Sequence, residues 1–210
     1  MTSVSKRSDV ESSVPQASDP TDVRSAILDA AVDLFYRQGY AATGVQQVVD
    51  AAGRTKGAFY HYWDSKESLL LEIHDTFHRY AIGRGRALQE QHLPPDQFVH
   101  QLIVDLFRQL ELYQRHMTVV FAQALYTPYE KYPRSKQLRD EYEQIVKSAI
   151  EDGIRGGVFR EDIEAPNVMA YGVMSFSSWA TNWYRPGGPL TAEQIGEMYA
   201  RVMVDGLRKR

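Results

Sequence analysis

Two histidines one helical turn apart have the spacing best suited to metal chemistry in this chain. His74 and His78 stand at positions i and i+4 of a segment with helical apolar spacing, so they share one helix face. Two such imidazoles can ligate zinc, but a catalytic site also needs a third ligand and a placed general base. The H-E-x-x-H pattern is absent and the chain has no cysteine. We therefore expect these two histidines to serve packing. The alternative function from another class of protein is a helical metal-dependent hydrolase that uses this pair.

A second group of residues has the chemistry to hold phosphate. Residues 53–63 contain Arg54, Lys56 and His61 and no acidic residue. Lys56 and Gly57 open a short predicted helix, where free backbone N–H groups and the helix dipole favour phosphate oxygens. Nearby hydroxyl and ammonium donors are Tyr60, Tyr62 and Lys66. This locally basic segment predicts a surface that binds nucleic acid.

Capping residues and glycines place these side chains on a helix-turn-helix. Thr43 and Gln46 are spaced as a capping box that opens one short helix, which ends at Gly53. Thr55 then caps a second short helix. Two short helices joined by a glycine-containing turn are typical of this motif. An earlier helix ends at Gly39, and a long later helix begins at a further predicted capping box, Asp64 with Glu67.

The whole-chain charge is −3 over 210 residues, which by itself argues against a nucleic-acid binder. The acidic residues of the first 70 all lie outside residues 53–63, so one face can be positive while the total is not. The chain has no apolar run long enough to span a membrane, and we expect a cytoplasmic protein. Residues 1–20 are rich in serine and lack aromatic residues, which predicts a disordered tail.

The run from Thr43 to Leu70 closely resembles the DNA-binding signature of the TetR family of regulators. The resemblance covers roughly residues 24–72 and implies that the second short helix enters the major groove of DNA. Trp63 replaces the commoner phenylalanine, and Arg54 stands where a small apolar residue is usual. By this resemblance we assign DNA contacts to Thr43, Gln46, Arg54, Thr55, Lys56, Gly57, Tyr60, His61, Tyr62 and Lys66.

The rest of the chain predicts a helical body with a dimer interface. Apolar stripes at helical spacing recur through residues 98–150, in several separate segments. Residues 167–184 are apolar almost all round, and residues 191–208 form another broad apolar face that begins with a predicted Thr191–Gln194 capping box. Two such helices from each subunit can form a four-helix interface. The resemblance gives the same pair this role, so we expect a homodimer through these two segments.

The loop of residues 183–191 resembles the corresponding loop of TetR-type regulators of fatty-acid and sterol catabolism that sense acyl-CoA thioesters. A plain connector is the competing interpretation, because proline and paired glycines also set turns. A basic run, Lys131, Arg134, Lys136 and Arg139, can hold the phosphates of such a ligand. Its competing interpretation is a solvated loop. The residues expected to line an apolar ligand pocket are Phe107, Tyr113, Phe121, Tyr126, Arg134, Trp179 and Trp183.

These observations predict an all-α fold of about nine helices. A helix-turn-helix domain over residues 21–70 precedes a ligand-binding and dimerisation domain over residues 71–210. The expected function is a ligand-responsive repressor that leaves a palindromic operator when an apolar effector binds, with no catalytic residue, metal or cofactor. A repressor of an efflux or detoxification system that senses hydrophobic drugs is the alternative within the class. Gly83 and Gly85 are a candidate pivot or end of the long helix.

Overall fold

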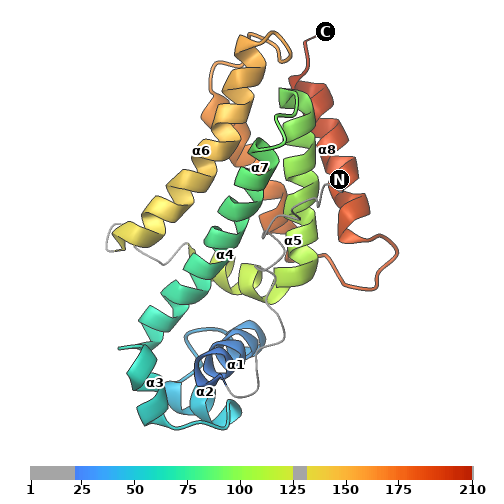
Figure 1. Ribbon diagram of the computed structural model, residues 1–210. Helices are drawn as coiled ribbons and strands as arrows, with labels where there is room; N and C mark the ends of the chain where they lie inside the picture. The colour runs from blue at the N-terminus through green and yellow to red at the C-terminus, as the bar shows by residue number, and fades with distance from the viewer. Residues whose placement is uncertain (1–21, 125–131, 210) are drawn as a thin grey trace, which may run out of the picture.

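The computed structural model describes residues 22–124 and 132–209, and this part of the chain folds into eight helices (Figure 1). The helices are α1 (Val23–Gln38), α2 (Val45–Ala51), α3 (Lys56–Tyr62), α4 (Lys66–Gln89), α5 (Pro95–Ala124), α6 (Pro133–Arg155), α7 (Pro166–Ala180) and α8 (Ala192–Leu207). The predicted tail of residues 1–20, together with Tyr126 and Lys131, lies outside the described residues.

Three short helices, α1 to α3, form a small unit at one end of the molecule (Figure 1). Asp22 caps α1 by accepting from the backbone N–H of Arg24 at 3.0 Å. Gly39 ends α1 with φ of 86°, a left-handed conformation that favours glycine. Thr55 accepts from the N–H of Ala58 at 3.2 Å, so the predicted cap of α3 is confirmed. This arrangement is the predicted helix-turn-helix with its supporting helix.

Two of the predicted capping boxes are wrong by one residue. The N-cap of α2 is Gly44, whose N–H donates to Gln47 Oε1 at 2.8 Å. Thr43 instead donates its hydroxyl to the Gly39 carbonyl at 2.8 Å, because its side chain is buried beneath the turn. The long helix α4 is capped by Ser65 with Ser68, in place of Asp64 with Glu67. Several adjacent polar residues can cap a helix, and packing of the turn selects one of them.

The core beneath α1 to α3 includes residues from distant parts of the chain. Ile27, Phe35 and Phe59 are buried in a cluster that also contains Ile73 from α4. Val119 and Val120 from the last turns of α5 belong to the same cluster. Arg115 of α5 also pairs with Asp33 of α1 at 2.8 Å. The last part of α5 therefore packs against the helix-turn-helix unit and completes its core.

The body is a bundle of α4 to α8 built around α5 (Figure 1). The backbone of α5 departs from helical geometry at Tyr113, with φ of −125° and ψ of 21°. The kink separates the two apolar stripes that the sequence predicts as two helices, which accounts for eight helices where about nine are expected. The helix α4 runs without interruption through Gly83 and Gly85, so neither glycine ends it.

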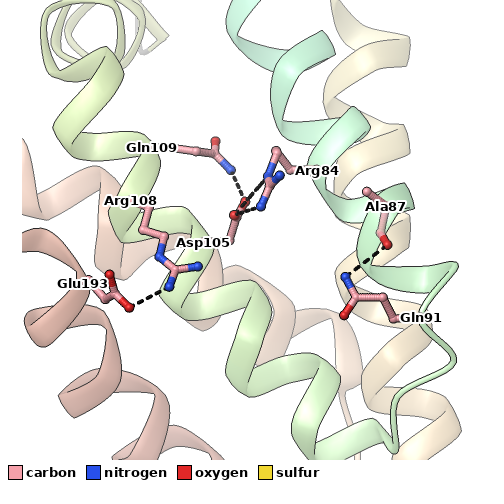
Figure 2. Close-up of polar contacts among 7 residues, drawn as sticks. All are labelled: Arg84, Ala87, Gln91, Asp105, Arg108, Gln109 and Glu193. Carbon is pink, nitrogen blue, oxygen red and sulfur yellow. Dashed lines mark hydrogen bonds and ion pairs between the residues drawn. The ribbon is translucent and has the colours of Figure 1, made fainter. Parts of the chain in front are cut away.

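Polar contacts tie α5 to its neighbours inside this bundle (Figure 2). Asp105 of α5 is 4% exposed and accepts from Arg84 of α4 at 2.6 Å and from Gln109 at 3.0 Å. Arg108 of α5 donates to Glu193 of α8 at 2.6 Å. A buried carboxylate needs such charged and hydrogen-bonding partners. Among the helices over residues 22–124 and 132–209, none has the length and apolar character required to cross a membrane.

Candidate functional site

The helix α3 presents polar and aromatic side chains to solvent from a firmly anchored base. Phe59 is fully buried, and Trp63 at the C-cap is 4% exposed. Tyr60 and Tyr62 are 55% and 41% exposed, large values for tyrosine in a small domain. The other predicted contact residues on or beside this face lie at the surface or partly buried, namely Gln46, Arg54, Thr55, Lys56, Gly57 and His61. A seven-residue helix held by two buried aromatic rings is a rigid platform for these groups.

Lys66 lies at the start of α4, but its ammonium is bound within the unit. Its Nζ donates to the backbone carbonyls of Tyr40 at 2.8 Å and Thr43 at 2.7 Å. The same Nζ lies 4.2 Å from the centre of the Tyr40 ring, a cation–π distance. Burial lowers the pKa of Lys66. Lys66 and the buried Thr43 are thus used internally to fix the turn before α2, whereas the sequence predicts both as DNA contacts.

The two histidines of α4 form part of a buried polar cluster. The rings of His74 and His78 stack with centroids 4.1 Å apart. Asp75 accepts from Ser135 of α6 at 2.6 Å, and Arg134 Nε lies 3.7 Å from the same carboxylate. Across residues 22–124 and 132–209, no cluster of three or more His, Cys, Asp or Glu side chains is arranged to hold a metal. These histidines pack α4 against α6.

A cavity of about 650 Å³ lies between α4, α5, α6 and α7. Its apolar wall comes from Phe77, Leu106, Val120, Phe121 and Met174. The polar and remaining aromatic lining residues are His78, Arg139, Tyr142, Tyr171, Ser175, Ser177 and Ser178. Arg139, Tyr171 and Ser175 are exposed and mark an open rim, whereas Leu106, Tyr142 and Ser177 are buried. The volume falls within the usual range for small-molecule sites.

The predicted ligand residues are distributed over the body, and Phe121 lines this cavity. Phe107 is buried against Tyr199 of α8, and Tyr113 is buried at the kink of α5. Trp179 is 71% exposed, and Trp183 lines a separate cavity of about 400 Å³ formed with α8. His78 and the three serines of α7 also line the cavity and were not predicted to do so, although three serines within four positions of an apolar helix indicate a polar cavity wall.

The first turns of α6 carry exposed cations, of which Arg139 lines the cavity. Arg134, Lys136 and Arg139 have side-chain exposures of 76%, 47% and 43%. Lys136 and Arg139 both pair with Asp140, whose pKa they lower. Tyr132 at the N-cap supplies no side-chain hydrogen bond, so the first N–H groups of α6 lack that partner. This basic start of α6 is suited to an anion.

Helices α7 and α8 share an exposed apolar face. The large side chains on it are Val168, Tyr171, Trp179, Met198 and Val202, between 45% and 75% exposed. The loop between the two helices adds Trp183 and Leu190. Monomeric proteins rarely expose so many large apolar residues on one pair of helices, and such surfaces mark interaction sites.

Comparison with known proteins assigns this architecture to a class. The description "Bacterial regulatory proteins, tetR family" matches residues 27–73, and "Tetracyclin repressor-like, C-terminal domain" matches residues 92–207. The chain therefore belongs to the TetR family, and is a ligand-responsive DNA-binding transcriptional repressor and not an enzyme.

Among its relatives is a repressor that is also named a ketosteroid transcriptional regulator. The chain is 30% identical to the HTH-type transcriptional repressor KstR2 of Mycobacterium tuberculosis, over 89% of this chain and 93% of that protein. The structure of this ketosteroid transcriptional regulator superposes with a TM-score of 0.79 at 26% identity, covering 90% of this chain and 97% of that one. The TetR-family regulator PfmR of Thermus thermophilus superposes with a TM-score of 0.76 at 28% identity, covering 87% and 99%.

Proposed function

We propose that the protein is a homodimeric repressor of lipid or sterol catabolism, released from a palindromic operator by an acyl-CoA thioester. The cavity between α4 and α7 takes the acyl group, and the basic start of α6 holds phosphates of the coenzyme. The observation that carries the proposal is an apolar cavity with the exposed Arg139 on its rim, on the helix that also carries Arg134 and Lys136. The likeness to KstR2 over most of both chains supports the metabolic assignment.

In this proposal α3 reads the major groove. Lys56, Gly57 and Tyr60 contact phosphate or base edges together with Gln46, Arg54, Thr55, His61 and Tyr62. Thr43 and Lys66 hold the turn that precedes α2, because their polar groups are bound to the protein itself. The dimer is formed by the apolar face of α7 and α8, and it sets the two α3 helices about 34 Å apart to match one turn of DNA.

Release follows from the way α5 connects the cavity to the DNA-binding unit. Val120 lines the cavity and also belongs to the core beneath α1 to α3. An effector that displaces Phe121 and Val120 therefore moves the end of α5 that packs against α1. A coupling of about 1 to 3 kcal/mol between the two sites is typical of such switches. Gly85 packs against Ile145 of α6, so α4 and α6 move together at this point.

The test measures binding of the dimer to DNA from upstream of its own gene by fluorescence anisotropy. A long-chain or steroid acyl-CoA is expected to release the DNA, whereas the free acid with separate coenzyme A does not. Arg134→Ala should weaken release, and Arg155→Ala, an equally exposed arginine at the other end of α6, should not. Equal potency of acid and thioester would remove the coenzyme from the proposal. Release by hydrophobic drugs alone would instead indicate a detoxification regulator.

A further inference from the structure

Three serine hydroxyls of the cavity wall already donate their protons within the protein. Ser175, Ser177 and Ser178 donate their hydroxyls to carbonyls of α7, those of Tyr171 at 2.6 Å, Met174 at 3.2 Å and Ser175 at 2.9 Å. A serine hydroxyl has one proton and two lone pairs. Each serine oxygen therefore presents lone pairs to the cavity while its proton is in use.

His78 also uses its ring proton within the protein, because of the tautomer that it adopts. Its Nδ1 lies 3.0 Å from the carbonyl oxygen of His74. A carbonyl oxygen only accepts hydrogen bonds, so Nδ1 carries the proton and Nε2, the ring nitrogen farther from the helix backbone, carries a lone pair. Burial, together with smaller effects of His74 and Arg139, lowers the pKa of His78 to about 4 against the opposing charge of Asp75. The ring is therefore neutral near pH 7.

The two tyrosines of the lining do not add a free hydrogen-bond donor to the cavity wall. The Tyr171 hydroxyl is hydrogen-bonded to Glu143, which raises the pKa of Tyr171. The Tyr142 hydroxyl oxygen is covered by protein, so it is not exposed to a ligand in the cavity. Arg139 on the rim is a charged donor among the residues that line the cavity. Inside that rim the cavity wall presents acceptors.

We propose that the cavity selects an effector whose apolar portion carries a neutral hydroxyl group, placed to donate to Nε2 of His78. This inference rests on the proposed function, which makes the cavity the effector site. A ketone or thioester oxygen at this position would face a lone pair, or would have to break a serine bond within α7. A cationic donor is disfavoured by Arg139 on the rim. The acyl or ring portion of the effector is therefore a hydroxylated one.

The experiment compares three probes that differ at one ring carbon, which carries a hydroxyl in cyclododecanol, a carbonyl in cyclododecanone and only hydrogen in cyclododecane. The symmetric ring gives the alcohol and the ketone a single polar position each, so differences report that group alone. Dissociation constants are obtained for the DNA-free protein by calorimetry and by the shift of its melting temperature. The alcohol is expected to bind about tenfold more tightly than the ketone, the effect of one hydrogen bond in a water-poor site. Because no DNA is present, failure of operator binding leaves this result intact.

Two cavity variants and a control variant test which side chains cause the preference for the alcohol. His78→Phe keeps an aromatic ring against His74 and is expected to abolish the preference for alcohol while hydrocarbon binding persists. Ser178→Ala is expected to reduce it, and it keeps the test usable where His78→Phe is poorly folded. Ser148→Ala removes a serine that bonds back to Gln144 on α6 outside this cavity, and should change nothing. A ketone bound as tightly as the alcohol, no binding of any probe, or a preference unchanged in both cavity variants would overturn the proposal.

Discussion

Lys56 and Lys66 lie ten residues apart at the starts of two helices, yet the structure gives them different tasks. Lys56 is exposed at the first turn of α3, whereas the ammonium of Lys66 is held by the carbonyls of Tyr40 and Thr43. An exposed lysine at a helix N-terminus can neutralise a phosphate and release a counterion. A lysine bound to two carbonyls stabilises the loop instead.

This contrast predicts different salt dependence for two alanine variants. Lys56→Ala should weaken DNA binding and lower the slope of log K against log salt by about one. Lys66→Ala should lower the free energy of unfolding by about 1 to 3 kcal/mol, because two carbonyls lose a charged partner, while the salt slope is retained. Urea unfolding and anisotropy titrations at several salt concentrations measure both quantities. A lowered slope in Lys66→Ala would instead identify it as a phosphate contact.

The buried His78 makes stability depend on pH. Its pKa is about 4 in the folded protein and 6.5 in the unfolded chain, because burial disfavours the charged ring. Between these values the unfolded chain binds a proton that the folded protein does not, so stability is fully present above pH 6.5 and falls toward pH 4. The expected loss is roughly 3 kcal/mol. Urea unfolding from pH 7 to 4 measures it, and His78→Phe should show a flatter profile. Parallel profiles would contradict the burial of a neutral ring.

At single residues, local patterns were predictable and tertiary partners were not. Thr55 was predicted as a cap because its hydroxyl needs only an N–H three residues away. Thr43 has the same chemistry, but its hydroxyl donates to the carbonyl of Gly39, which the fold places beside it. Nothing in the spacing of His78 reveals that α6 and α7 will enclose a cavity next to it. The charge and position of α3 were predictable, whereas the internal use of Lys66 was not.

At the scale of elements, α8 approaches α5 so closely that one glycine is required. A Cβ on Gly196 would lie 3.0 Å from Val104 Cα and 3.0 Å from Phe107 Cβ. The atoms that this Cβ would meet belong to or adjoin the α5 backbone, which cannot shift as the end of a flexible side chain can. A side chain at position 196 would therefore force α5 and α8 apart. Gly206, near the end of the same helix, has nothing within 4 Å of its Cβ position.

These two glycines of α8 form a matched pair for mutation. Gly196→Ala should destabilise the protein by about 1 to 3 kcal/mol through overpacking. Gly206→Ala should be neutral or stabilising by up to about 1 kcal/mol, because alanine is the better helix former. Thermal and urea unfolding of the two variants measure the difference. Equal stability of both variants would mean that α5 and α8 pack less closely.

Helix boundaries followed from periodicity because an apolar stripe and its caps are local features. The segments predicted for the dimer, residues 167–184 and 191–208, lie close to the bounds of α7 and α8. The kink of α5 lies at Tyr113, the last residue of one predicted apolar stripe, so the sequence predicts two helices where the structure has one bent helix. The cavity was not predictable, because its walls come from four helices and use the same residue types as the core.

At the scale of the whole molecule, α7 and α8 expose large apolar side chains that no other part of the described chain covers. Val202 is 75% exposed and Trp179 is 71% exposed, while the cores on both sides of the kink are well packed. A twofold interface presents the same patch from each subunit, so one charge placed there appears twice and close to its own copy. Burying such charges without a partner is costly. The dimer proposal is therefore most directly tested in the middle of this face.

Val202→Glu should convert the dimer to a monomer at micromolar concentration while helix content and thermal unfolding of the monomer remain measurable. Operator affinity should fall by at least about 100-fold, because two linked DNA-binding units lose their effective concentration. Leu112→Glu is the control, since Leu112 is 55% exposed on α5, where it lines a cavity with Val32 and Tyr36 of α1 and with Pro186. Sedimentation velocity gives the oligomeric state, and anisotropy gives the affinity. A Val202→Glu protein that stays dimeric, or a Leu112→Glu protein that dissociates, would move the interface to another face. A monomer that keeps full operator affinity would instead separate dimerisation from DNA recognition.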